Sequence, residues 1–322
     1  MLVYWAAIAA GFALLVWGAD RFVAGAAGTA RALGVSPLIV GLTIVGFGTA
    51  APEILVSAMA AITGSPAIGV GNALGSNITN IALILGMTAI IAPLTVRSET
   101  LRRELPILLA IMLIGAALLA DRVLDRLDGA ILLTVLAAFI AWLIHLARTS
   151  APGDPIVQEF AAEIPTALPL PRSLLWLAAG LLVLLASSRL LVWGAVNIAT
   201  ALGISDLVIG LTVVAIGTSL PELAASIVAA RRNEHDIAVG NVLGSNIYNL
   251  LAVMGLPGVI HPGPIPAAVL TRDFPVMISL TLAFFFLAHG VGRPGYFSRL
   301  SGGLLLASFA AYQLILYFGI LS

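Results

Sequence analysis

The chain has 322 residues, of which 61% are hydrophobic and only 9% are charged, and its formal net charge is zero. Soluble globular domains carry about a quarter charged residues, so this composition excludes a soluble fold and indicates a chain whose solvent is mostly lipid. The absence of cysteine excludes disulfides and thiol-based chemistry. The arginines form no cluster outside short loops, which excludes a nucleic-acid partner.

A membrane-spanning helix needs about 20 largely apolar residues. In chain order the sequence predicts ten such spans, at residues 2–30, 36–63, 66–92, 103–121, 127–147, 173–201, 205–230, 236–260, 271–290 and 299–320. Their apolar runs are continuous, whereas the strands of transmembrane barrels alternate apolar and polar residues. We therefore expect an all-α membrane protein built as a helical bundle.

The second predicted span contains "GTAAPE" at residues 48–53, and the seventh contains "GTSLPE" at residues 217–222. Proline has no N–H, so Pro52 and Pro221 deprive the carbonyls of residues 48 and 217, both glycines, of their helical partners. In hydrocarbon a freed carbonyl must find another partner or line a polar cavity. A simple proline kink is the alternative interpretation. In either case we expect both spans to be broken helices.

Each proline is followed directly by a glutamate, Glu53 or Glu222, near the start of a second half-helix. The helix dipole favours a carboxylate there, but a charged side chain at the bilayer centre still costs about 2.5–3.5 kcal/mol and marks function by default. These two are the only acids that we expect deep in the spans, with no basic side chain at the same depth. The expected partner is therefore a cation from outside the protein.

The third and eighth predicted spans repeat a second motif, "GNALGSNITN" at residues 71–80 and "GNVLGSNIYN" at residues 240–249. In each copy an asparagine, a serine and a second asparagine recur every four residues, so they share one helix face. We favour cation binding over helix–helix bonding for Ser76, Asn80, Ser245 and Asn249. For another four amides both interpretations stay open: Asn72, Asn77, Asn241 and Asn246.

The two motifs belong to one repeat, because residues 20–86 align without a gap on the sequence 169 positions further along. Five predicted spans lie on each side of a polar, proline-rich segment, so the two copies must have opposite orientations in the membrane, as in many secondary transporters. We expect a first repeat at residues 1–148, a linker at 149–172 and a second repeat at 173–322. A duplication that only builds a scaffold is the weaker interpretation, because a scaffold does not require buried carboxylates in both copies.

The orientation is predicted from arginine alone, because the chain has no lysine. With the N-terminus outside, ten loop arginines lie on the inner side and three, among them Arg272, on the outer side. Positive charge is enriched on the cytoplasmic side of membrane proteins. We therefore expect a multi-pass protein of the cell (inner) membrane, with both termini outside and the linker in the cytoplasm.

The motif side chains and the freed carbonyls offer a cation only oxygen atoms. Calcium takes about 6–8 oxygen ligands, whereas transition metals recruit cysteine or histidine, and no histidine lies in these motifs. Two carboxylates also match the charge of one divalent ion. A carboxylate that binds calcium cannot bind a proton at the same time, so we expect protons and calcium to compete.

The paired motifs "GTAAPE…GNALGSNITN" and "GTSLPE…GNVLGSNIYN" resemble the alpha repeats of the sodium/calcium exchanger family, of prokaryotic type, within the cation/calcium antiporter superfamily. The resemblance implies ten transmembrane helices in two inverted five-helix repeats. It also implies exchange of calcium for sodium by alternating access, as the first and sixth spans slide. By motif, the family's cation ligands fall on Thr49, Glu53, Ser76, Asn80, Thr218, Ser219, Glu222, Ser245 and Asn249.

The same resemblance implies a transporter and not an enzyme, with no cofactor. The partners that it implies are calcium and sodium ions and the lipid bilayer, without an obligate protein partner. A cation channel is a distant alternative, because channels more often use a ring of subunits around an open filter. An intramembrane enzyme would need a base beside its nucleophile, and the motif serines have no nearby histidine in the sequence.

The chain departs from the family pattern at two places. Ala50 stands where the family usually has serine, although Ser219 keeps the equivalent hydroxyl. Asn80 and Asn249 are amides, where some exchangers carry an aspartate. The driving cation, sodium or proton, and the stoichiometry of exchange therefore stay open.

Overall fold

The computed structural model describes residues 1–33, 50–96, 98–149, 168–233, 235–288 and 295–321. In this part of the chain eight helices are long and apolar enough to cross a membrane: Leu2–Ala32, Pro66–Ile91, Glu104–Asp121, Arg126–His145, Leu170–Leu202, His235–Ile260, Val269–Leu287 and Arg299–Gly319. The bent pair Asp206–Thr218 and Leu220–Arg231 forms a ninth span. The prediction of an all-α membrane protein is confirmed. Within the remaining predicted span, 36–63, residues 36–49 lie outside the described part.

The helices in chain order are α1 (Leu2–Ala32), α4 (Ala51–Ile62), α5 (Pro66–Ile78), α6 (Leu85–Ile91), α7 (Ser98–Leu118), α8 (Arg126–Thr149), α10 (Leu170–Leu202), α11 (Asp206–Ile209), α12 (Ala215–Thr218), α13 (Leu220–Arg231), α14 (His235–Tyr248), α15 (Gly255–Ile260), α16 (Phe274–Ala288) and α17 (Arg299–Leu321). Short π-helical segments interrupt several spans: η2 (Thr79–Ile84), η4 (Gly210–Val214), η5 (Asn249–Val253) and η6 (Val269–Asp273). A 3-10 turn, η3 (Leu119–Asp121), ends the span of α7.

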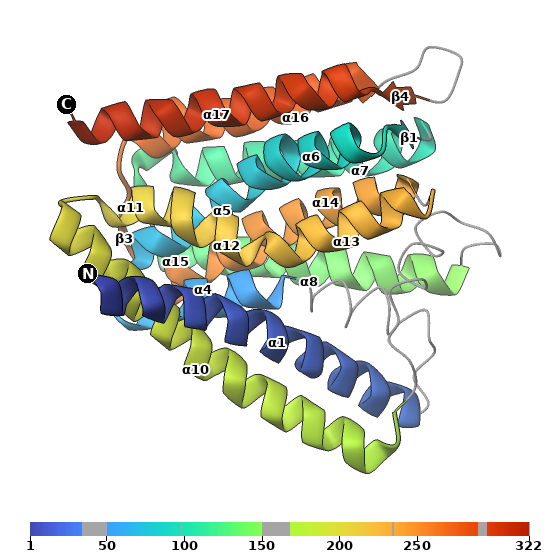
Figure 1. Ribbon diagram of the computed structural model, residues 1–322, viewed down its shortest axis with the longest axis horizontal. Helices are drawn as coiled ribbons and strands as arrows, with labels where there is room; N and C mark the ends of the chain where they lie inside the picture. The colour runs from blue at the N-terminus through green and yellow to red at the C-terminus, as the bar shows by residue number, and fades with distance from the viewer. Residues whose placement is uncertain (34–49, 97, 150–167, 234, 289–294, 322) are drawn as a thin grey trace.

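The two long helices α1 and α10 lie side by side along one edge of the molecule (Figure 1). They approach closely at glycines, because a Cβ on Gly11 would lie 3.0 Å from the Cβ of Leu191. The repeat-equivalent residue on α10, Gly180, makes the matching close contact with Phe22 on α1. The two repeat-equivalent glycines therefore make equivalent contacts, each with the other helix, and the order of these contacts along the chain shows that the two helices run antiparallel. The structure therefore shows the inverted relation that the sequence predicts.

The spans that carry the second motif form the centre of the bundle. In Pro66–Ile91 and His235–Ile260, 78% and 89% of the most apolar stretch is buried, against 28–39% in the other single-helix spans. Across the repeat boundary, α5 packs against η5 and α14 packs against η2. The polar residues of this motif are therefore surrounded by protein and not by lipid.

Two short antiparallel ribbons join the repeats. β1 (Leu94–Val96) pairs with β4 (Gly295–Phe297), with Leu94 opposite Phe297, and β2 (Val123–Leu124) pairs with β3 (Gly263–Pro264). Figure 1 shows β1 and β4 at one end of the bundle and β3 at the other. Each ribbon joins one repeat to the other, in keeping with the inverted arrangement. The ribbons were not predicted, because two or three residues are too few for an alternating pattern to identify.

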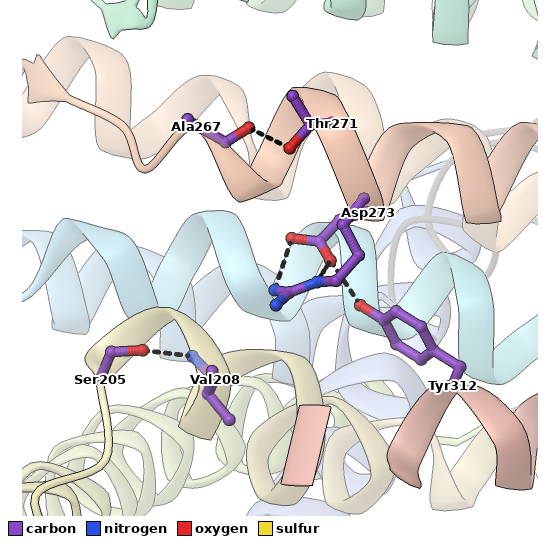
Figure 2. Close-up of polar contacts among 7 residues, drawn as sticks. Ser205, Val208, Ala267, Thr271, Asp273 and Tyr312 are labelled. Atoms are coloured by element: carbon purple, nitrogen blue, oxygen red, sulfur yellow. Dashed lines mark hydrogen bonds and ion pairs between the residues drawn. The ribbon is translucent and has the colours of Figure 1, made fainter. Parts of the chain in front are cut away.

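A partly buried ion pair at the beginning of the ninth predicted span corrects one expectation. Arg272, which was expected in an outer loop, lies in η6, where its Nε donates to Oδ1 of Asp273 at 2.6 Å. Asp273 is fully buried and also accepts a hydrogen bond of 2.9 Å from the Tyr312 hydroxyl on α17 (Figure 2). Glu53 and Glu222 are therefore not the only buried acids. The Asp273 carboxylate is paired with the guanidinium of Arg272, its neighbour in the chain.

Candidate cation site

The predicted break in the seventh span is present, and Ala50 of the second span has the same backbone conformation as Ser219 at that break. α12 ends at Thr218, Ser219 has φ −85° and ψ 6°, and α13 begins at Leu220 after a bend of 42°. Ala50, the repeat-equivalent of Ser219, has φ −81° and ψ 0° directly before α4. Proline lacks an N–H and has a helical φ, so it suits the first turn of a new helix at both positions.

Both motif glutamates lie in the first turn of their half-helices and are buried, with 1% of Glu53 and 2% of Glu222 exposed. Each half-helix packs against the π-helical segment of the other repeat: α4 against η5, and α13 against η2. The hydroxyl of Ser219 lies 3.5 Å from Oε1 of Glu53, so the break of the second repeat contacts the glutamate of the first. The two motif copies therefore meet inside the protein.

The second motif is the place where each central span changes from α-helix to π-helix. η2 begins at Thr79 and η5 at Asn249, at nearly repeat-equivalent positions. π-Helical turns are rare and frequent at functional sites, and they place Asn80 and Asn249, each 1% exposed, in the buried centre. Periodicity predicts a regular helix here. The only hint against it is that residues 76, 77, 79 and 80 are all polar and cover more than one helix face.

Four buried oxygens of the predicted ligands have no hydrogen-bond partner among the described residues: Oε2 of Glu53, Oδ1 of Asn80, Oγ of Ser245 and Oδ1 of Asn249. Leaving such an atom unsatisfied costs about 1–3 kcal/mol, so each one in a native protein calls for an explanation. All four can offer a lone pair, which is what a hard cation such as calcium requires. The described residues therefore fit an oxygen-bound cation.

The carboxylates are too few to bind a metal ion alone. Among the described residues no three histidine, aspartate or glutamate side chains gather into one cluster. A cation here would depend on the neutral oxygens of serine, threonine and asparagine as well as on Glu53 and Glu222. Ligand sets of this kind suit hard ions that accept carbonyl and hydroxyl oxygens.

Asn72 joins three parts of the site, which the sequence did not reveal. Its Nδ2 donates to the main-chain carbonyl of Glu53 at 3.1 Å. Its Oδ1 accepts from the hydroxyl of Thr218 in the other repeat at 3.2 Å, and lies 3.4 Å from the hydroxyl of Ser76. A second contact between the repeats is made by Asn80, whose Nδ2 donates to Oδ1 of Asn246 at 3.0 Å.

These contacts bear on the four amides for which two interpretations were open. Asn72 and Asn246 bond across the repeat boundary, Asn77 Nδ2 donates to the Ala73 carbonyl at 2.9 Å, and Asn241 Nδ2 lies 3.4 Å from the Ser226 hydroxyl. Each amide thus has a partner within the protein, which favours hydrogen bonding between and within helices for this group.

The structure describes all of the predicted hydroxyl ligands except Thr49. Thr218, Ser219 and Ser245 are 1–3% exposed, and Ser76 is fully buried. Thr49 lies outside the described residues, as does the glycine before it. At Gly217, the residue whose carbonyl is freed by Pro221, a Cβ would overlap the ring of Phe12 on α1. The described reason for this glycine is therefore close packing against α1.

Comparison with known proteins identifies the same architecture. The profile of a family described as "Sodium/calcium exchanger protein" matches residues 3–145 and 172–318. "Putative antiporter CaxA" of Alkalimonas amylolytica is 48% identical over 317 residues, which is 98% of this chain and 99% of that protein. "Inner membrane protein YrbG" of Escherichia coli is 41% identical over 320 residues, which is 98% of each chain.

A solved structure supports the fold. It is that of the sodium-calcium exchanger NCX_Mj soaked with 100 mM Na+ and 10 mM Sr2+, with a TM-score of 0.64 and 33% sequence identity. The match covers 96% of this chain and 97% of the other. The likeness therefore extends over both repeats and is not limited to the motifs.

Proposed function

This chain belongs to the sodium/calcium exchanger protein family, and from that premise we propose that it exchanges calcium for sodium across a membrane. The observation that carries the proposal is the set of four buried oxygens without a partner among the described residues. They come from both repeats, on α4, η2, α14 and η5. The half-helices that carry the two glutamates pack against these π-helical segments, α4 against η5 and α13 against η2. A calcium ion would satisfy these oxygens and match the charge of the two carboxylates.

We propose that the site is formed by the oxygens of the motif residues in both repeats. Glu53 and Glu222 supply the charge, and the hydroxyl and amide groups complete the coordination. The full ligand set is Thr49, Glu53, Ser76, Asn80, Thr218, Ser219, Glu222, Ser245 and Asn249. The transported ions are the substrates, and the proposed activity requires no cofactor.

The same geometry explains why the transport would be an exchange and not a leak. When calcium leaves, the two buried carboxylates lose the divalent charge that balanced theirs, and removing one partner of a buried charge pair costs about 3–5 kcal/mol. An empty site therefore disfavours the conformational change of alternating access, in which the site closes to one side of the membrane and opens to the other. Sodium ions that bind the same oxygens remove this penalty, so each half of the cycle requires an ion.

A proton is the alternative driving cation. Ala50 is fully buried and lacks the hydroxyl that Ser219 has at the equivalent position of the other repeat, so the first repeat offers sodium one oxygen fewer. Protonation of Glu53 and Glu222 would neutralise the empty site without needing that oxygen. A calcium/proton antiporter would therefore use the same two carboxylates.

Uptake of radioactive calcium into proteoliposomes tests these possibilities. Vesicles loaded with sodium and diluted into choline should accumulate calcium above its equilibrium level, and vesicles loaded with choline should not. Accumulation driven equally well by a proton gradient without sodium would support the calcium/proton alternative. Calcium entry that only equilibrates, under every gradient, would contradict antiport and favour a channel. A Glu53→Gln protein provides the background of the assay.

We also propose that the protein lies in the cell membrane with both termini outside and residues 149–172 as a cytoplasmic linker. The arginine distribution supports this orientation. Because the chain has no cysteine, a single cysteine can be introduced at Ser150 without removing any other. An impermeant maleimide should leave it unlabelled in intact cells and label it after lysis. Ready labelling in intact cells would contradict the orientation.

A further inference from the structure

Asn72 is outside the proposed ligand set but contacts two of its members, Thr218 and Ser76. It is fully buried in α5, and its amide bonds to α4 and α12, which belong to different repeats. The hydroxyls of Thr218 and Ser76, both in the proposed ligand set, lie 3.2 Å and 3.4 Å from its Oδ1. One side chain therefore contacts ligands from both halves of the site.

The orientation of the Asn72 side-chain amide is determined by which of its neighbours can donate and which can accept a hydrogen bond. Its other contact is the main-chain carbonyl of Glu53, 3.1 Å from Nδ2, and a carbonyl can only accept. Nδ2 must therefore face Glu53, and Oδ1 must face the two hydroxyls. An oxygen in that position can only accept hydrogen bonds, so the hydroxyls donate to it.

A hydroxyl has one hydrogen and two lone pairs. When Thr218 or Ser76 donates its hydrogen to Asn72, its lone pairs remain available for a cation and its hydrogen cannot point at that cation. Thr218 has a further acceptor, the Val214 carbonyl at 3.1 Å, which also directs the hydrogen away from the ion. For Ser76 the described acceptor is Asn72 itself. We infer that Asn72 is a positioning residue that orients these two hydroxyls toward the cation and so sets its affinity.

The repeat-equivalent residue has different contacts and provides a matched control. Asn241 lies 3.4 Å from the hydroxyl of Ser226, which is outside the proposed ligand set, and 8% of Asn241 is exposed. Both asparagines occupy the same place in the same motif on central helices. A general effect of removing a buried amide should therefore be similar at the two positions, whereas an effect through the ligand hydroxyls should be confined to Asn72.

The inference rests on the proposed function and predicts a change in calcium affinity. Asn72→Ala should weaken calcium binding about tenfold, because the Ser76 hydroxyl loses its described acceptor and the Thr218 hydroxyl keeps only main-chain acceptors; tenfold corresponds to about 1.4 kcal/mol. Asn241→Ala should change the affinity by less than about twofold. Calcium binding is measured by isothermal titration of the purified full chain in sodium-free detergent solution, and the melting temperature without calcium reports on folding.

A double-mutant cycle separates positioning from packing, because groups that act through each other give non-additive effects. Once Thr218→Val has removed one of the hydroxyls that Asn72 orients, adding Asn72→Ala should cost less than the full tenfold. The inference is overturned if the effects of the two substitutions on calcium affinity simply multiply. It is also overturned if Asn241→Ala weakens calcium binding as much as Asn72→Ala does.

Two further outcomes are decisive. If Asn72→Ala does not fold, Asn72→Ser takes its place with the same expectation, because one hydroxyl cannot occupy the positions of both Nδ2 and Oδ1. If the wild-type chain binds and transports calcium and the Asn72 variants bind it equally well, the inference fails and the proposed function stands. If the wild-type chain neither binds nor transports calcium, both fail.

Discussion

The same half-helix has two different surroundings in the two repeats. In α4 of the first repeat, eight of the 12 residues are buried, whereas in the equivalent α13 only four of 12 are buried. Ala51 is 3% exposed and its counterpart Leu220 is 46% exposed. α4 packs against the long helix α10, but α13 does not pack comparably against α1, although all four helices lie within the described residues.

This difference does not come from the motifs, which are nearly identical. It comes from the position of the α1–α10 pair, which covers one half-helix and leaves the other less covered. Because the copies are inverted, a second arrangement in which the pair covers α13 and uncovers α4 would expose the site from the opposite side. The asymmetry is therefore what one conformation of an alternating-access transporter should show, and the glutamates should be equivalent in function although their surroundings differ.

The largest predicted effect tests that equivalence. Glu53→Gln and Glu222→Gln should each lower calcium transport about 100-fold or more, because leaving a buried charge without its partner costs about 3–5 kcal/mol. The double variant should be little worse than either single one, since groups that act as a unit are not additive. The measurement is sodium-driven calcium uptake at equal protein content. Near-normal uptake by either single variant would show that only one repeat binds the ion.

A smaller effect is predicted for the glycines that allow the central helices to approach. A Cβ on Gly75 would lie 2.7 Å from the Cβ of Ala215 and 2.7 Å from the Cα of Leu211, whereas one on Gly244 would meet no described atom within 4 Å. Gly75→Ala should lower stability by about 1–3 kcal/mol, as overpacking does, and Gly244→Ala should not. Melting temperatures in detergent test this, and equal losses would contradict the packing difference.

The repeat, the break in the seventh span and the buried polar motifs could all be predicted from the sequence. Each depends on a property of residues that are near one another in the chain, such as a proline before a glutamate or polar residues at four-residue spacing. The inverted arrangement follows from an odd number of spans in each copy. Such features are local or are counted along the chain, so the sequence reveals them.

The features that the sequence did not predict depend on contacts between segments that are far apart in the chain. The hydrogen bond from Thr218 to Asn72 links residues 146 positions apart, and that from Tyr312 to Asp273 links residues 39 positions apart. The π-helical turns at Thr79 and Asn249 also have no periodic signal, because each lasts about one turn. The individual side chains are visible in the sequence, but their partners are set by how the two repeats pack.

The smallest predicted effect concerns the position where the repeats differ most clearly in ligand chemistry. Ala50→Ser adds to the first repeat the hydroxyl that Ser219 already has in the second. Sodium affinity should rise several-fold, since one hydrogen-bonding or ligating oxygen is worth about 1 kcal/mol, and calcium affinity should change less. Competition of sodium against calcium in the titration measures both. An unchanged sodium affinity would show that position 50 does not contact the ion.

The central claim is that the two glutamates form one site and not two. Equilibrium binding of radioactive calcium to the purified chain, with the protein concentration determined independently, tests it most directly. The account predicts one calcium ion per chain for the wild-type protein and none, at the same calcium concentration, for Glu53→Gln or for Glu222→Gln. Two calcium ions per wild-type chain, with one retained in each single variant, would contradict a shared site.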